Sequence, residues 1–166
     1  MTRGVSVAVA CVAVLGAACT GDVAAEFGGG ARPAVLELPA QLVGLSVVPE
    51  DVGSNLETID RPYVDSVAVF SMRDGDLLKA TLQVARFNRL ARPGDASFRN
   101  SIVSTIGGRR PVAFRVADTI VHSTAASEQN LFAWFAEDGF FVLSVQKDFE
   151  FPRTLLRRLV ELNLEL

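Results

Sequence analysis

The feature that most constrains the fold is a pair of alternating runs, residues 64–72 and 77–87, joined by RDGD at residues 73–76. Apolar and polar side chains alternate in both runs, as they do along a strand with one buried face. Asp-Gly between two such runs is typical of a tight hairpin turn, because glycine accepts the positive φ angles that the turn requires. We therefore expect an antiparallel sheet built from hairpins.

Two further pairs of strands are predicted in the second half of the chain. Residues 112–116 and 119–124 flank Ala117-Asp118, a candidate for a tight turn. Residues 131–135 and 140–145 flank a second Asp-Gly sequence, which again indicates a hairpin.

Two helices are predicted between and after these strands. Asp95 follows a Pro-Gly break and is well placed to cap the first helix, which Gly107-Gly108 would end. Pro152 can open the second helix, since a missing N–H costs nothing at the first helical position. We expect each helix to bury one apolar face: Phe98, Ile102, Val103 and Ile106 in the first; Leu155, Leu156, Leu159, Val160 and Leu162 in the second. The basic side chains of the second helix, Arg153, Arg157 and Arg158, are expected to point away from the core.

The order of elements indicates the fold class. Before the first hairpin, LELP at residues 36–39 and LSVVP at 45–49 are expected to be short extended pieces that end at their prolines. Strands, a helix, more strands and a last helix then follow. This order predicts an α+β fold, with a single antiparallel sheet built from hairpins and two helices packed on it.

The first residues have the layout of an export signal. Arg3 precedes an apolar run over residues 5–15, which is shorter than the ~20 residues needed to span a bilayer. The following sequence, LGAAC at residues 15–19, resembles the lipobox of bacterial lipoproteins. The resemblance implies cleavage before Cys19, lipidation of its thiol, and a protein anchored at the extracytoplasmic face of the cell membrane. The alternative is an ordinary secretory signal that is cut near Ala18.

We therefore expect a cleavable signal peptide at residues 1–18, a flexible tether at 19–33 and a single α+β domain at 34–166. The tether is indicated by its glycines and its lack of apolar periodicity. Both cysteines, Cys11 and Cys19, lie before the domain. The domain therefore has no disulfide and must be held together by its core.

Net charge restricts the partners. The formal charge of the chain is −3, and removing Arg3 with the signal peptide makes it −4. This acidic balance argues against nucleic acid as a partner and against electrostatic adhesion to anionic lipid. Membrane attachment is therefore expected to rest on the lipid at Cys19.

Source and family are indicated by composition and by short motifs. Of the 16 basic residues only Lys79 and Lys147 are lysines, a bias that suggests a GC-rich, actinobacterial source. Residues 45–162 resemble PsbP-like domains in the order of their elements. The chain more closely resembles uncharacterised actinobacterial lipoproteins, in DRPYVD at residues 60–65, ATLQV at 80–84 and FEFPRTLLRR at 149–158. The resemblance names a class of protein and implies no chemistry.

No catalytic or metal-binding set is expected. His122 is the only histidine, and its neighbour Ser123 would lie on the opposite face of the same strand. One histidine without a free cysteine excludes the common zinc sets. The remaining acidic pairs are expected to be structural: Asp74 with Asp76 and Glu137 with Asp138 lie in predicted turns, and Asp148 and Glu150 lie just before the last helix. We expect no cofactor and no enzymatic activity, and rank a hydrolase based on His122 last.

Three residues are candidates for contact with a partner or ligand. Arg61 and Tyr63 flank Pro62 at the rigid entry to a strand, and both residue types are common interface anchors. The alternative is that Arg61 pairs with Asp60 or Asp65 and fixes the loop. Trp134 lies in a hairpin that is apolar on both faces, so it is either enclosed between helices or lines a cavity. The main hypothesis is a non-catalytic interaction module with an envelope protein as partner. The alternative is a carrier or sensor of an apolar ligand held between sheet and helix.

Overall fold

The computed structural model describes residues 36–50, 63–107, 111–125 and 128–162. Pro33–Leu166 form one compact unit. The predicted signal peptide and tether, residues 1–33, lie outside the described residues. The elements of the compact unit, in chain order, are β1 (Gln41–Leu42), β2 (Leu45–Glu50), β3 (Val64–Asp74), β4 (Leu77–Phe87), α2 (Ala96–Gly107), β5 (Val112–Val116), β6 (Thr119–Ala125), β7 (Gln129–Phe135), β8 (Gly139–Gln146) and α3 (Pro152–Glu161).

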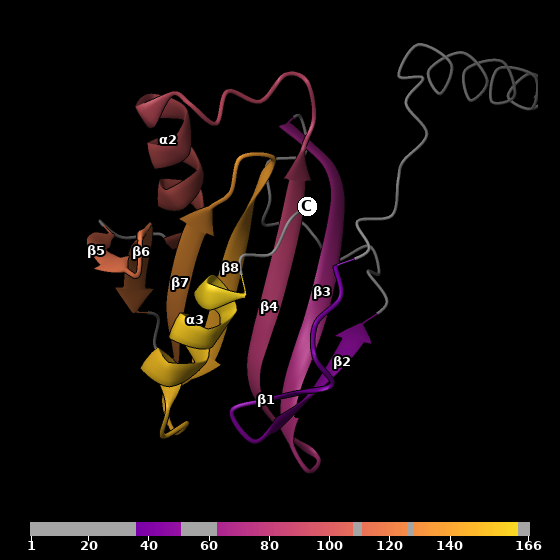
Figure 1. The fold of residues 1–166 in the computed structure, drawn as a ribbon. Helices are drawn as coiled ribbons and strands as arrows, with labels where there is room; N and C mark the ends of the chain where they lie inside the picture. Colours follow the sequence, from indigo (N-terminus) through magenta and orange to yellow (C-terminus); the bar gives the residue numbers. More distant parts are fainter. Residues whose placement is uncertain (1–35, 51–62, 108–110, 126–127, 163–166) are drawn as a thin grey trace, which may run out of the picture. The chain divides into compact units, whose positions relative to one another are not determined.

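The described strands form one antiparallel sheet of eight strands in the order β1-β2-β3-β4-β8-β7-β6-β5. Two meanders, β1 to β4 and β5 to β8, join where β4 pairs with β8 (Figure 1). The segment that contains α2 leads the chain from β4, in the middle of the sheet, to β5 at the far edge. The predicted α+β class, with one antiparallel sheet and two helices, is confirmed for the described residues.

The turn between β3 and β4 is shorter than the sequence predicts. Arg73 and Asp74 belong to β3, and Asp74 pairs with Leu77, so that Gly75 and Asp76 alone form the turn. Gly75 has a φ of 56°, which glycine adopts without the steric cost that a side chain would add. The register shifts between Met72 and Arg73, because Met72 pairs with Ala80 and Arg73 with Leu78, so that Lys79 is an extra residue on β4.

α3 covers one face of the sheet. Its side chains Leu155, Leu156 and Leu159 are almost completely buried in the larger of two hydrophobic clusters. The cluster takes alternate residues of the central strands, such as Phe141 and Leu143 of β8. Leu162 was predicted to share this buried face, and that prediction is wrong. The helix ends at Glu161, and Leu162, which caps its C-terminus, is 40% exposed.

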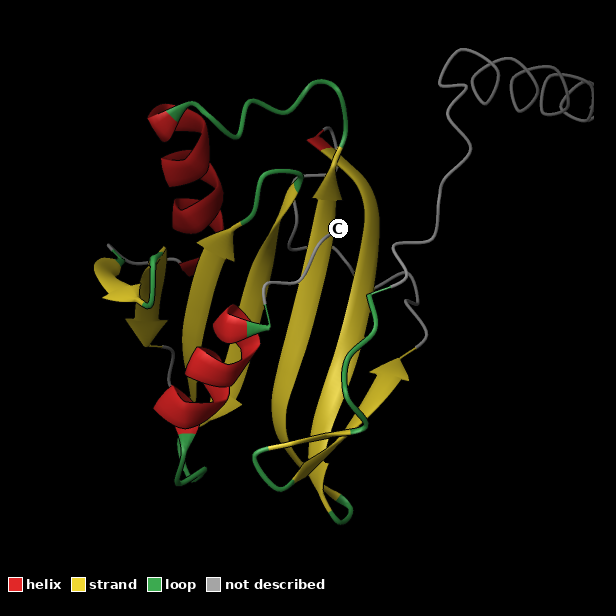
Figure 2. Ribbon diagram, in the orientation of Figure 1, coloured by secondary structure: helices red, strands yellow, loops and turns green. Residues whose placement is uncertain are grey.

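α2 covers part of the opposite face (Figure 2). Its Ile102 packs with Phe140 and Val142 of β8, which alternate with the residues beneath α3. The Asp95 carboxylate accepts hydrogen bonds from the backbone N–H and the hydroxyl of Ser97, each at 2.8 Å, and so caps the start of the helix. A helix on each side of the sheet explains why the β7–β8 hairpin is apolar on both faces.

One prediction for the first strands is wrong. Residues 36–39 lie outside the sheet, and the short strand β1 begins after them, at Gln41. β2 does not stop at Pro49 but continues through it to Glu50, with Pro49 opposite Phe70 of β3. β1 pairs with β2 only at Leu45 and Ser46, so none of the described strands lies beside Pro49 on the outer side of β2. Its missing N–H breaks no sheet hydrogen bond there.

Candidate functional site

Trp134 lies inside the domain and does not reach its surface. Its side chain is 4% exposed, in the cluster beneath α3. The indole ring stacks on Phe141 of the neighbouring strand, with 5.0 Å between ring centroids and an interplanar angle of 7°. Trp134 is therefore a core residue whose fluorescence reports on the packing between α3 and the sheet.

Tyr63 connects the start of β3 to α2. Its ring meets Phe98 edge to face at 5.0 Å, and its carbonyl oxygen accepts a hydrogen bond from the N–H of Asn88 at 3.0 Å. These contacts hold the segment between β4 and α2 against the sheet. Arg61, its predicted companion, and Cys19, the predicted lipidation site, lie outside the described residues.

His122 lies in β6 on the side of the sheet that faces α2. Its half-buried ring meets Phe135 edge to face at 6.4 Å. Burial, with a smaller contribution from the charge of Arg99 on α2, lowers the pKa of His122 below its usual value of 6.5. The imidazole is therefore neutral near pH 7. Ser123, the next residue of the strand, lies on the opposite face and cannot reach it.

The acidic pairs are separated and exposed. Asp74 ends β3 and Asp76 lies in the turn that follows it, and Glu137 and Asp138 lie in the β7–β8 turn. The Asp148 carboxylate accepts a hydrogen bond from the Lys79 ammonium at 2.7 Å, and this bond lowers the pKa of Asp148. Within the described ranges, no three His, Cys, Asp or Glu side chains are grouped so that they could hold a metal ion.

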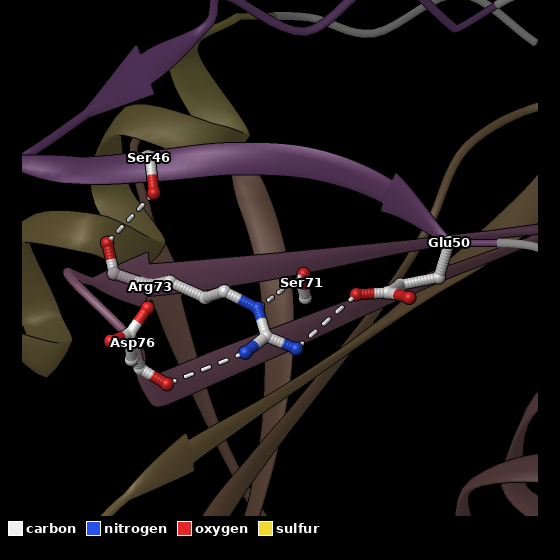
Figure 3. A network of polar contacts seen from close by, with 5 residues as sticks. All are labelled: Ser46, Glu50, Ser71, Arg73 and Asp76. Atoms are coloured by element: carbon white, nitrogen blue, oxygen red, sulfur yellow. Dashed lines mark hydrogen bonds and ion pairs between the residues drawn. The ribbon is translucent and has the colours of Figure 1, made fainter.

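The sequence reasoning missed a polar network around Arg73 (Figure 3). The Arg73 guanidinium donates to the Ser71 hydroxyl at 3.3 Å and to the Asp76 carbonyl at 3.4 Å, and lies 3.6 Å from the Glu50 carboxylate. The Ser46 hydroxyl donates to the Arg73 carbonyl at 3.1 Å. The network connects β2, β3 and the turn before β4. Its contacts are long and its ion pair is about 40% exposed, which is typical of a structural link.

The β5–β6 hairpin carries the most exposed apolar side chains of the sheet edge. Val112 is 69% exposed and Phe114 is 37% exposed, both on the α3 side of β5. Ile120 of β6 is 56% exposed on the other side. β5 pairs with β6 and is the last strand of the sheet, so its outer edge has no partner among the described strands. The prediction of strands 112–116 and 119–124 contained no sign that β5 would be an edge.

Comparison with known proteins does not identify the chain. No protein-family model matches it, and neither the curated proteins nor the solved structures yielded a match. None of the described helices is long and apolar enough to cross a membrane. The function must be inferred from the residues of this chain.

Proposed function

We propose that the protein is a lipid-anchored, non-catalytic interaction module on the extracytoplasmic face of the cell membrane. The observation that supports an interaction module is the exposed edge strand β5, which presents Val112 and Phe114 to solvent. Proteins commonly protect such edges with lysine, proline or a bulge. β5 itself contains no lysine, proline or bulge: its register with β6 is regular from Val112 to Val116, and Arg115 is its one charged residue. Its edge is therefore left able to pair with another strand.

The edge is suited to a protein partner in extended conformation. The outward N–H and C=O groups of β5 offer main-chain hydrogen bonds to an added strand. Phe114 is anchored on its inner side, where its ring meets Phe132 of β7 edge to face at 6.4 Å. The exposed part of the ring can cover an apolar side chain of the partner without first losing much conformational freedom. A partner would therefore gain both affinity and register from this strand.

The anchor is proposed from the lipobox-like sequence that ends at Cys19. Two or more acyl chains give stable membrane attachment, at about 0.8 kcal/mol for each buried methylene group. We expect radioactive palmitate to label the full chain in bacteria and the Cys19→Ala variant to lose the label. Equal labelling of both would remove the anchor from the proposal.

Partner binding can be tested in membranes that carry the anchored protein. Val112→Lys places a charge on the edge of β5, and Leu77→Lys makes the same change at a 63% exposed position of the β3–β4 hairpin. We expect crosslinked complexes to be lost with the first variant and retained with the second. Complexes that persist in Val112→Lys would show that β5 is not the contact surface.

The carrier of an apolar ligand remains the second candidate, and the burial around Trp134 argues against it. Leu155, Leu156 and Phe141 are at most 2% exposed, so their surfaces are occupied by other side chains of the core. A carrier should show bound lipid in native mass spectrometry and a change of Trp134 fluorescence when lipid is added. Finding both would replace the interaction module with the carrier.

A further inference from the structure

We infer that β5 binds β5 of a second copy of this chain in antiparallel orientation, so that two eight-stranded sheets join into one. This inference rests on the proposed function, because it names the partner of the same edge. Twofold-symmetric dimers, in which the same surface serves both partners, are the commonest oligomers of soluble proteins. Placing two antiparallel copies of the β5 sequence, VAFRV, side by side shows which residues would face one another.

A twofold axis through Phe114 gives a complementary register. Phe114 then lies opposite Phe114 of the other copy, and Val112 lies opposite Val116. Aromatic and β-branched side chains in these positions are favourable cross-strand neighbours. Both pairs lie on the α3 side of the sheet, where the partner would cover the exposed surface of Val112 and Phe114.

Charge is compatible with the same register. Arg115, the one charged residue of β5, lies opposite Ala113 of the other copy and not opposite a second arginine. Ala113 is exposed, so its position has room for the long arginine side chain. No like charges therefore face one another across the twofold axis, a juxtaposition that would destabilise the pairing.

The contact is small, which suggests where it acts. Five paired residues bury less surface than the ~1,000 Å² expected of a stable complex. We therefore expect a weak dimer in solution. Two copies anchored in one membrane are held at a high effective concentration, which favours pairing without any additional contact. Dimerisation through β5 would then depend on the anchor at Cys19.

Single cysteines can report the register, because Cys19 is the only cysteine after the predicted cleavage site. Directly opposite residues in an antiparallel pair have Cα atoms about 5 Å apart, within reach of a disulfide. With Phe114→Cys, we expect mild oxidation of membranes to give a disulfide-linked dimer. Val112→Cys is the matched control. Its two copies would lie four residues apart along the strands, about 13 Å, too far for a disulfide.

The control also detects disulfides that form by random collision between copies. Val112 is more exposed than Phe114, so a cysteine at position 112 would form such disulfides at least as readily. A dimer with Phe114→Cys but not with Val112→Cys supports the register. Equal dimer yields, or no dimer from either variant, would overturn it. Palmitate labelling of the same samples separates the two proposals, because a labelled chain without the dimer leaves the anchored module intact.

A second pair of variants tests the charge argument. In the Phe114→Cys background, Ala113→Arg places arginine opposite Arg115 of the other copy at two symmetric positions. We expect about a fivefold lower yield of the disulfide dimer. Ala113→Glu makes a change of similar size but should keep or raise the yield, because it places opposite charges together. The reverse order of yields would refute antiparallel pairing about Phe114.

Discussion

The attachment of α3 to the sheet can be tested with two leucines that the sequence alone treats alike. Leu159 and Leu162 fall on the same predicted helical face, but the structure leaves Leu159 1% exposed and Leu162 40% exposed. Leu159→Ala removes buried atoms and leaves a cavity between α3 and the central strands. Such changes cost about 3 kcal/mol of unfolding free energy. Leu162→Ala removes the same atoms beyond the end of the helix, where no closed cavity forms, and should cost less than about 1 kcal/mol.

The assay is urea unfolding of Pro33–Leu166, the compact unit that contains both hydrophobic clusters. Fluorescence of the buried Trp134 follows the transition. With a slope of about 2 kcal/mol per molar urea, Leu159→Ala should lower the midpoint by about 1.5 M. Leu162→Ala should lower it by less than about 0.5 M. Equal shifts would refute the end of the helix at Glu161 and the burial that follows from it.

Three further predictions concern ionisable groups. Because the pKa of folded His122 is lowered from 6.5, its contribution to stability is present above that pH and is lost as the pH falls toward the folded pKa. His122→Gln should therefore reduce the difference between urea midpoints measured at about pH 8 and about pH 5; an unchanged difference would contradict the lowered pKa. Asp95→Ala should lower the thermal midpoint more than Asp95→Asn, which can still accept the hydrogen bonds from Ser97; equal losses would show that the cap does not stabilise α2. Lys79→Met should raise the pKa of Asp148 toward 3.8 in an NMR titration, because the ammonium hydrogen bond lowers it in the native protein; a pKa that does not move would show that the pair is not formed in solution.

Features that depend on neighbours in the chain were predictable. The β3–β4 hairpin follows from alternation and Asp-Gly, the start of α2 from Asp95, and the start of α3 from Pro152. Each signal acts within a few residues, through backbone angles that glycine and proline favour or through a side chain that caps the adjacent N–H groups. The limits of these local signals are also visible. Proline is a reliable end to a strand only if the strand has neighbours on both sides, and at Pro49 the described sheet has a neighbour on one side only.

The candidate sites were less accessible to sequence reasoning. Trp134 is a candidate because its hairpin is apolar on both faces, and Tyr63 because it stands at the rigid entry to a strand. The structure places both in packing contacts. Arg73 was assigned to a turn, although it belongs to β3 and approaches Glu50 across the strand pair. A carboxylate 23 positions away leaves no trace in the alternation around Arg73.

The sequence by itself determined the three hairpins, the two helices and most of their apolar faces, but it did not reveal β1 or the end of β2. Only the tertiary structure decided that β4 pairs with β8, that α2 and α3 lie on opposite faces, and that β5 is the last strand. The physical reason is the range of the interactions. Local backbone preferences are written in adjacent residues, whereas strand order is settled by packing between segments that are far apart in the chain. The edge of β5, on which the proposed dimer depends, is a result of that order.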